Sequence, residues 1–361
     1  MIPIAKPSIG VEEKKAVNEV LDSGMIACGS VVSEFEQRFA SYCGASWGVA
    51  TTSGTSALCV ALKALGVSEK DHVLTTPFSF MATANSILYC NAKPVFADIC
   101  EESFNINPER IREVLDEDDR ITTLLLVHLY GLPCDMGEIM KLVREYQLKL
   151  VEDCAQAHGA QYRGKKVGSF GDAACFSFYP TKNMTTGEGG MIVSSNDELI
   201  ENSRVFINHG MRERYLHEEL GFNYRMTNIQ AAIGLCQLEK LDSFNDSRIS
   251  NAAFLTKNLD GLGWLTTPNA PPGYKHVFHQ YTVKVEERDP FIKYLSDKGI
   301  GYGIHYPKTM CEQPLYHKLG LNESFEVADR VSGEVVSLPV HPSLSQQDLE
   351  YICSSLEEYG R

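Results

Sequence analysis

The sequence of 361 residues has no apolar run of bilayer length; Leu124–Leu129 is interrupted by His128 and is far too short. The segment Met1–Pro7 has no apolar core, so we expect no signal peptide. Net positive charge is also missing, because 33 Lys and Arg residues face 47 Asp and Glu residues and give a formal charge of −14. Such a balance argues against a nucleic-acid-binding surface. We therefore expect a cytoplasmic protein that binds neither membranes nor nucleic acid.

Paired cysteines are absent as well. The eleven cysteines are scattered without a Cys-x-x-Cys pair, and most of them lie in apolar contexts. This pattern favours small buried side chains in a reducing compartment over a disulfide framework or a zinc site, so no metal is expected. No internal repeat or low-complexity segment occurs. The length and the 43% hydrophobic content predict a sizeable core divided between two domains.

Short apolar runs alternate with helical periodicity over the first half of the chain. Alternation of this kind predicts an α/β domain with a mainly parallel sheet. The seven expected strands are Trp47–Thr51, His72–Thr75, Pro94–Ala97, Ile121–Val127, Leu148–Glu152, Ala173–Phe178 and Met191–Ser194. The helices expected around them are Val11–Ser23, Val31–Tyr42, Ser56–Leu65, Phe80–Cys90, Pro108–Asp116 and Met136–Tyr146.

The pattern changes after a long helical stretch, Thr227–Leu259, which is long enough to bridge two domains. Beyond it we expect strands at His276–Val285 and, irregularly, Gly301–His305, with helices at Pro290–Lys298, Phe325–Val335 and Gln346–Tyr359. We therefore predict a large domain over residues 1–240, including the N-terminal helix, and a small C-terminal α+β domain over residues 241–361.

Two polar features follow neighbouring strands of the expected sheet. Glu152 and Asp153 end one strand, and Lys182 lies in the loop after the next, before a glycine-rich segment. In an open parallel sheet both positions lie at the edge where ligands bind. A lysine that can form a Schiff base, with a carboxylate facing a pyridinium nitrogen, is the minimum equipment for pyridoxal phosphate (PLP) chemistry. The pair therefore predicts a PLP site.

The segment Thr52–Leu58 is a candidate phosphate site. It follows the first expected strand, is rich in small hydroxyl residues and glycine, and opens a helix. Backbone N–H groups at a helix N-terminus attract anions. An ordinary Ser/Thr helix cap is the alternative. Ser177, at the end of another strand, could add a hydroxyl group.

Each candidate also has a plainer interpretation when taken alone. Asp153 could cap a turn of helix, Lys182 could be a solvated lysine, and Phe80 could belong to the core. His305 could be a structural histidine, and Arg225 a surface arginine unless a phosphate lies nearby. The order of these residues along the chain says more than any one of them.

That order resembles a known family. The chain carries S-G-T-S-A-L, T-P-F-S-F-M-A-T-A-N, V-E-D-C-A-Q-A-H-G-A, F-S-F-Y-P-T-K-N, G-E-G-G-M-I-V, F-N-Y-R-M-T-N-I-Q-A-A-I-G-L and G-I-H-Y-P. These motifs closely resemble the DegT/DnrJ/StrS family of nucleotide-sugar aminotransferases, which are PLP-dependent enzymes of fold type I. The resemblance runs from the I-A-K-P opening to S-L-P-V-H-P near the C-terminus. It implies a large domain with a mainly parallel seven-stranded sheet and a small α+β domain.

Carried over by position, the resemblance implies that Lys182 forms the Schiff base and that Asp153 pairs with the pyridinium nitrogen. Phe80 would stack on the ring, and Gln156 would lie close to the cofactor. The other positions that it implies are Gly54, Thr55 and Ser177 for the phosphate, Asn223 for the phosphate of the neighbouring subunit, and His305, Tyr306 and Arg225 for the sugar nucleotide.

The resemblance also implies a homodimer with shared active sites and a two-step transfer. An amino donor, glutamate, would react first, and a keto sugar linked to a nucleoside diphosphate would then accept the amino group. Lys182 would act as nucleophile and as base. The amino sugar would serve polysaccharide, glycan or secondary-metabolite synthesis. The sequence leaves open the nucleotide, the sugar, the keto position, the stereochemistry and any assembly beyond a dimer.

Three alternatives remain at this point. Sugar dehydratases of the same family carry histidine where this chain has Lys182. A non-catalytic regulatory relative would have lost Lys182 or Asp153, and both are present. A fold-type I enzyme acting on amino acids alone usually needs an arginine clamp, and no arginine is close to His305 in the sequence. Two departures from the family, Met25 in place of an aromatic residue and Cys311 in place of a histidine, are expected on the substrate side.

Overall fold

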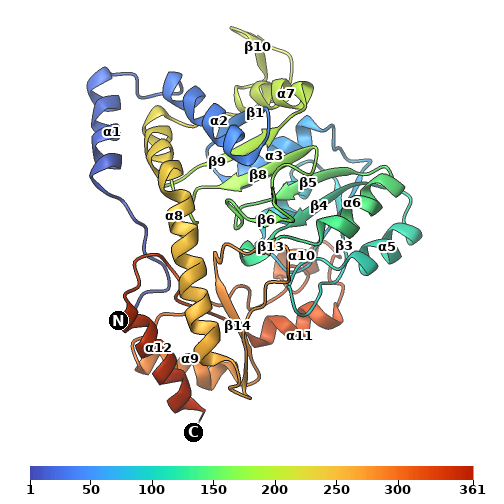
Figure 1. Cartoon of the computed structure of the whole chain (residues 1–361). Helices are drawn as coiled ribbons and strands as arrows, with labels where there is room; N and C mark the ends of the chain where they lie inside the picture. The colour runs from blue at the N-terminus through green and yellow to red at the C-terminus, as the bar shows by residue number, and fades with distance from the viewer. Residues whose placement is uncertain (361) are drawn as a thin grey trace.

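The computed structural model describes residues 1–360 and is organised around a seven-stranded sheet (Figure 1). The strand order is β1-β9-β8-β5-β4-β2-β3. Only β9 runs antiparallel to its neighbours, β1 and β8, and the other pairs are parallel. The strands are β1 (Trp47–Thr51), β2 (His72–Thr75), β3 (Lys93–Phe96), β4 (Ile121–Val127), β5 (Lys149–Asp153), β8 (Ala173–Ser177) and β9 (Gly190–Ser194).

Helices cover both faces of the sheet (Figure 1). Successive strand residues point to opposite faces, so each strand contributes to two cores. On β8, Phe176 packs with α2 and the first half of α8, whereas Cys175 packs with α3 and α7. On β4, Leu124 and Leu126 meet α5 and α6, and Leu125 belongs to the opposite core. The helices are α2 (Ser30–Cys43), α3 (Gly54–Ala64), α4 (Ala82–Leu88), α5 (Pro108–Glu117), α6 (Met136–Glu145), α7 (Asp197–Ile207) and α8 (Asn228–Leu259).

Helix α8 runs the length of the molecule and joins two regions of core (Figure 1). Its first half packs against the sheet layer and against α1 (Val11–Ser23). Its last turns, through Ala252, Leu255 and Leu259, enter a separate core with the C-terminal elements. Those elements are β12 (Leu265–Thr266), β14 (Tyr281–Val285), α9 (Arg288–Asp297), β15 (Val335–Leu338) and α12 (Gln346–Tyr359). Two other C-terminal helices, α10 (Pro314–Lys318) and α11 (Glu326–Glu334), pack in separate clusters that include residues of the sheet region. The expected boundary at residue 240 lies within α8, and the division into two domains stays a prediction.

All seven strands expected from the sequence are present, and the differences lie elsewhere. Gly301–His305 is not a strand; only an isolated bridge joins Gly303 to Ser337. The strand expected over His276–Val285 begins at Tyr281, because Phe278 has a positive φ of 42° that interrupts the extended chain. Elements that the sequence did not predict are α7, α10, β15, the 3₁₀ turn η1 (Leu129–Gly131), and the short strands β6 (Gln161–Tyr162), β7 (Lys165–Lys166), β10 (Met211–Glu213), β11 (Leu216–His217), β12 and β13 (Tyr274–Lys275).

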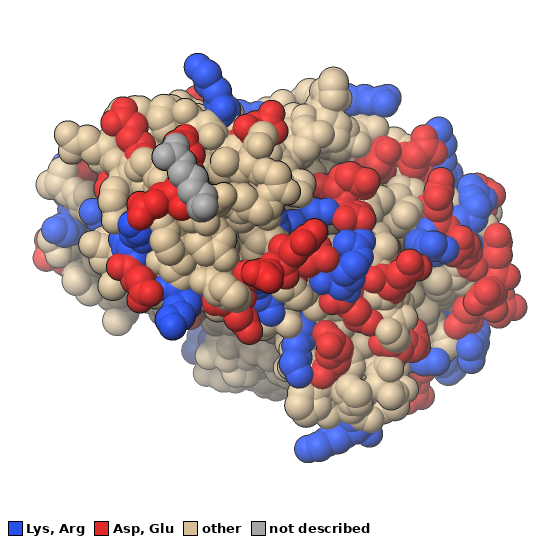
Figure 2. All heavy atoms as spheres, turned by 90° about the horizontal axis from the view of Figure 1, so that it is seen from below, with Lys and Arg blue, Asp and Glu red and all other residues tan. Residues whose placement is uncertain are grey.

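The cysteines and the surface agree with the composition. All eleven cysteines are free, and eight of them are buried. On the face shown in Figure 2, Lys and Arg side chains are interspersed with Asp and Glu and do not gather in a basic stripe. Among residues 1–360, no helix combines the length and the apolarity that a bilayer crossing requires.

Candidate active site

A cavity of about 480 Å³ opens at the carboxyl ends of the parallel strands. That volume lies in the range of roughly 300–1,000 Å³ usual for small-molecule sites. Asp153 is the last residue of β5, and Ser177 is the last residue of β8. Nine of the residues predicted for the site line this cavity: Gly54, Thr55, Phe80, Asp153, Gln156, Ser177, Lys182, His305 and Tyr306.

The N-terminus of α3 forms one end of the cavity. Ser53 caps the helix, and its Oγ accepts a hydrogen bond of 3.1 Å from the backbone N–H of Ser56. Gly54 follows, and a Cβ atom there would lie only 2.7 Å from Cβ of Ser177. The missing side chain therefore lets the helix start approach the end of β8. This end combines hydroxyl groups, backbone N–H groups and the helix dipole, which together suit a phosphate group.

Replacing Gly54 by alanine should weaken PLP binding about tenfold or more. The new methyl group overlaps Ser177, so the first turn of α3 must shift away from the place where a phosphate would bind. The measurement is a titration of the cofactor-free protein with PLP, followed by absorbance. Gly333→Ala is the matched control, because nothing lies within 4 Å of a Cβ at that glycine. Equal affinity of both variants would contradict this account of the cavity end.

Asp153 also lines the cavity and is 5% exposed. Its Oδ1 accepts a hydrogen bond from the backbone N–H of Ala155, and its Oδ2 accepts one from the hydroxyl of Thr83, each at 3.0 Å. Burial raises the pKa of this carboxyl group, while the two hydrogen bonds and the charge of Lys182 act in the opposite direction. The result is an oriented carboxylate with lone pairs left for a ligand.

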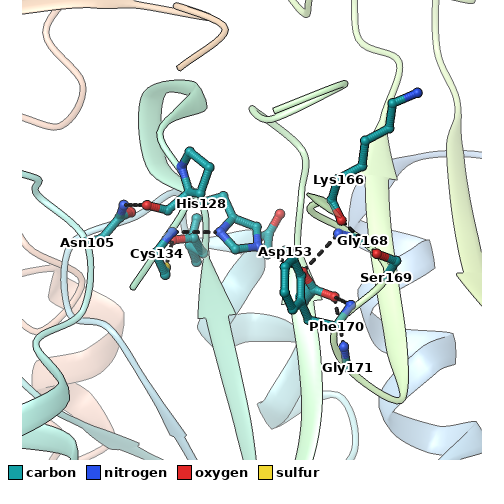
Figure 3. Close-up of polar contacts among 12 residues, drawn as sticks. Asn105, His128, Cys134, Asp153, Lys166, Gly168, Ser169, Phe170 and Gly171 are labelled. Carbon is teal, nitrogen blue, oxygen red and sulfur yellow. Dashed lines mark hydrogen bonds and ion pairs between the residues drawn. The ribbon is translucent and has the colours of Figure 1, made fainter. Parts of the chain in front are cut away.

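Glu152, the preceding residue, does not line the cavity. Its carboxylate lies in a polar cluster with His128, Gly168, Phe170 and Gly171, which are labelled in Figure 3. Its carboxylate accepts hydrogen bonds of 2.7–3.0 Å from Nε2–H of His128 and from the backbone N–H groups of Gly168, Phe170 and Gly171. Nδ1 of His128 accepts a bond of 3.0 Å from the N–H of Cys134, so Nε2 carries the proton. The cluster also fixes the main chain of Asp153, whose carbonyl accepts a hydrogen bond of 3.1 Å from the N–H of His128.

His128, Glu152 and Cys154 have ligand atoms within 4.8 Å of one another, a spacing that could suit a metal ion. Each imidazole nitrogen of His128 and each carboxylate oxygen of Glu152 already forms a hydrogen bond: Nε2 donates one, and the other three atoms accept. A cation there would displace hydrogen bonds that are already satisfied in a fully buried position. The cluster therefore acts as a structural support behind Asp153.

Glu152→Gln should reduce the free energy of unfolding by about 3 kcal/mol at pH 7, because a charged acceptor of several buried hydrogen bonds is lost. Burial alone raises the pKa of Glu152, but the bonds from His128 and the backbone lower it below its ordinary 4.5. Its stabilisation is therefore present above pH 4.5 and is lost as the pH falls below that value. Urea denaturation of the parent and of Glu152→Gln should show a difference in the free energy of unfolding that becomes smaller in acid.

Glu145→Gln serves as the control, since Glu145 forms an exposed ion pair with Arg112 and should contribute little. A Glu152→Gln protein as stable as the parent at pH 7 would contradict the role given to the cluster.

Lys182 lines the same cavity and belongs to the segment that follows β8. Burial lowers the pKa of its amine to about 8, and the negative charge of Asp153 opposes that change. Its neighbour Asn183 anchors the segment, because the side-chain amide donates to Oδ1 of Asn245 and to the carbonyl of Val277. An amine with this pKa is partly neutral at physiological pH, so it can act as a nucleophile and as a base.

Four more side chains line the cavity: Phe80, Gln156, His305 and Tyr306. Phe80 is 58% exposed, so it is not a core residue, and its ring centre lies 6.1 Å from that of Tyr306. Oε1 of Gln156 accepts a bond from the N–H of Tyr130, and Nε2 donates to the hydroxyl of Tyr306 at 3.1 Å. Burial, with the charge of Lys182, lowers the pKa of His305 to about 4, so its imidazole is neutral.

Four residues discussed from the sequence do not line this cavity. Arg225 donates a hydrogen bond of 2.8 Å to Oδ1 of Asn208, and Asn223 forms a bridge with Asn208. Met25 is 68% exposed in the loop before α2. Cys311 is buried with Phe96 and Tyr316, so the expectation that it lies on the substrate side is wrong.

A model of the DegT/DnrJ/EryC1/StrS aminotransferase family matches residues 7–357. The chain belongs to this family. It is 37% identical over 368 residues to "GDP-perosamine synthase" of Escherichia coli O157:H7, covering 99% of this chain and 98% of that protein. It is 38% identical over 354 residues to "Pleiotropic regulatory protein" of Geobacillus stearothermophilus, covering 97% and 95%. Other family members at 37–38% identity are named for UDP- and dTDP-linked sugars, so this level of identity does not select a nucleotide.

Solved structures of the family have the same fold. DesV of S. venezuelae, solved in complex with a ketimine intermediate, is 35% identical and superposes with a TM-score of 0.93 over 97% of this chain and 94% of that one. The prediction of fold type I, with a mainly parallel seven-stranded sheet, is confirmed.

Further cavity residues of this family member were not singled out in the sequence. Thr83 contacts Asp153, Ser79 contacts Thr83, and His279 and Glu188 also line the cavity. Thr83 occurs within a quoted motif, but its helical context gave no sign of a contact with a strand end 70 residues away. His279 precedes β14 in a stretch expected to be strand, where nothing marks a cavity residue.

Proposed function

We propose that this chain is a PLP-dependent aminotransferase that moves an amino group from glutamate to the keto group of a nucleotide-linked sugar. The product is an amino sugar for polysaccharide, glycan or secondary-metabolite synthesis. One observation carries the proposal: a single cavity holds an amine with a lowered pKa, a buried carboxylate and a helix N-terminus, contributed by Lys182, Asp153 and α3. The family match supports it.

The side chains of the cavity fit PLP. The phosphate would be held by Gly54, Thr55 and Ser177, where the close approach of residue 54 to Ser177 is possible only with glycine. Asp153 would face the ring nitrogen, and Phe80 would cover the ring, with Gln156 beside it. Bound PLP supplies an electron sink for carbanion chemistry.

Lys182 carries the proton transfers. Its amine would lie beside the reacting carbon of the amino donor, take a proton there and give it to the neighbouring carbon of the cofactor. In the second half of the reaction it would move a proton in the reverse direction, from the cofactor carbon to the sugar carbon. A pKa of about 8 favours this exchange, because the amine is readily protonated and deprotonated near neutral pH. Asp153, held by two hydrogen bonds that favour its charged form, would keep positive charge on the ring nitrogen.

The sugar nucleotide would bind at the rim, next to His305 and Tyr306. Among residues 1–360, no arginine lines the cavity, although the proposed ligands, PLP and a nucleotide-linked sugar, carry several phosphate charges. We propose that a second copy of the chain supplies Arg225 for the sugar nucleotide and Asn223 for the cofactor phosphate, which gives a homodimer with shared sites.

The alternatives have less support. A dehydratase of this family would carry histidine at position 182, and Lys182 instead lies in the cavity. A regulatory role without catalysis, suggested by the name of one relative, does not require Lys182 and Asp153 to meet in one cavity.

The test uses the PLP-loaded protein, glutamate labelled with ¹⁵N, and a panel of 3-keto and 4-keto sugars linked to GDP, UDP or dTDP. The proposal predicts ¹⁵N in the sugar product, detected by mass spectrometry, for at least one member of the panel. Label transferred to 2-keto acids but to no sugar would favour an enzyme acting on amino acids alone.

A further inference from the structure

The side chain of Asp153 is held by Thr83, a residue of another segment. Oδ2 accepts the Thr83 hydroxyl at 3.0 Å, while Oδ1 is held by the backbone of Ala155. Each carboxylate oxygen therefore has one protein donor, and the two donors together fix the plane of the group. The Ala155 bond is local, since it joins residues two apart, whereas the Thr83 bond spans 70 residues.

The direction of the hydrogen bonds around Thr83 follows from their chemistry. A carboxylate only accepts, so Thr83 must donate its single hydroxyl proton to Asp153. The oxygen of Thr83 is then free to accept from the hydroxyl of Ser79, 3.1 Å away. Along the hydrogen-bonded row from Ser79 through Thr83 to Asp153, each hydroxyl thus donates toward the carboxylate. These hydrogen bonds stabilise the charged form of Asp153.

Thr83 is itself firmly placed. It is 1% exposed in the first turn of α4, and its carbonyl accepts a hydrogen bond of 2.7 Å from the hydroxyl of Ser86. Its N–H donates to the carbonyl of Phe80 at 3.1 Å. The same turn therefore presents Phe80 at the rim of the cavity and the Thr83 hydroxyl at its buried end.

We propose that Thr83 is a positioning residue for the amino-transfer reaction, which orients Asp153 and keeps it charged toward the ring nitrogen of the cofactor. This inference rests on the proposed function, because Asp153 matters in this way only if PLP binds in the cavity. Thr83 acts through Asp153 on the electron sink, so its effect belongs to the transition state more than to substrate binding.

The experiment compares the PLP-loaded proteins Thr83→Val and Thr83→Ala, which lack the hydroxyl, with Thr83→Ser, which keeps it. The readouts are the pH titration of the visible absorbance of bound PLP, and kcat and KM for glutamate. Without the hydroxyl, the pH midpoint of the absorbance change of bound PLP should rise by about one unit. The charged form of Asp153 is then less stabilised, and the ring nitrogen is less protonated as a result. We expect kcat to fall roughly tenfold with KM changed less than twofold, and Thr83→Ser to restore both readouts.

Thr75→Val is the matched control. Thr75 is also fully buried at a strand end, but its hydroxyl donates to the carbonyl of Leu125 and does not contact Asp153. The Thr75→Val protein should therefore keep the pH midpoint and the kcat of the parent, even if it loses as much stability as Thr83→Val. The same shift in Thr75→Val, or a failure of Thr83→Ser to rescue, would assign the effect to packing and overturn the inference.

Asp153→Asn separates this inference from the function on which it rests. If Asp153→Asn changes the titration and kcat while Thr83→Val and Thr83→Ala match the parent, only the role of Thr83 is wrong. If Asp153→Asn also behaves like the parent, the assignment of Asp153 in the proposed function fails.

Discussion

Replacing Lys182 by alanine is expected to lower amino transfer by a factor of at least about 10⁴, because one side chain serves as nucleophile and as base. The variant should also fail to develop the yellow absorbance of lysine-bound PLP. Lys182 lines the cavity, and burial has lowered the pKa of its amine to about 8, as this double role requires. Turnover with a keto-sugar substrate and the visible spectrum after addition of PLP measure the two effects.

Two controls accompany this variant. Lys182→Arg keeps a positive charge but cannot bind the cofactor covalently, so it should be equally inactive. Lys166→Ala removes a lysine outside the cavity, whose Nζ bonds to the carbonyl of Tyr42, and should leave both readouts unchanged. A yellow, active Lys182→Ala protein would disprove the assignment.

Replacing Asp153 by asparagine is expected to reduce kcat by roughly 10²–10³-fold, a typical loss for a preorganised electrostatic partner of the transition state. Asparagine has nearly the same shape, and its side-chain oxygen can still accept from Ala155, so the fold should be preserved. The change removes the negative charge that would hold a proton on the ring nitrogen. Lys182 remains, so the protein should still turn yellow with PLP.

The measurement is single-turnover reaction with glutamate, with a thermal melt to confirm folding. Asp172→Asn is a suitable control, since that aspartate supports the main chain of Leu150 and lies outside the cavity. Unchanged kcat in Asp153→Asn would contradict the role given to this carboxylate.

The sheet was predictable because its signal is local. Each strand is a short apolar run, and the alternating faces of β4 and β8 each meet their own helices. The C-terminal elements were harder to predict. The positive φ of Phe278 is a property of the folded chain, and the contact of Gly303 with Ser337 joins two distant segments.

The candidate site was partly predictable for a similar reason. Strand ends and a helix start led to Asp153, Ser177 and Gly54, all of which line the cavity, and the family resemblance supplied their expected roles. Thr83 could not be inferred, because its contact with Asp153 joins residues 70 positions apart and exists only in the folded chain.

The strand pattern alone also could not tell which of two adjacent acids faces the ligand, and only the family resemblance selected Asp153. Glu152 and Asp153 are both buried, but Glu152 is saturated by its N–H donors, and only Asp153 lines the cavity. Alternation along a strand puts the two on opposite sides without saying which side holds the cavity.

The measurement that tests the central claim most directly is the visible absorbance of the purified protein with PLP, before and after addition of glutamate. The account predicts a yellow band that bleaches with glutamate and returns when a suitable keto-sugar nucleotide is added. A protein that develops no band with added PLP would contradict the claim that Lys182 and Asp153 form a PLP site.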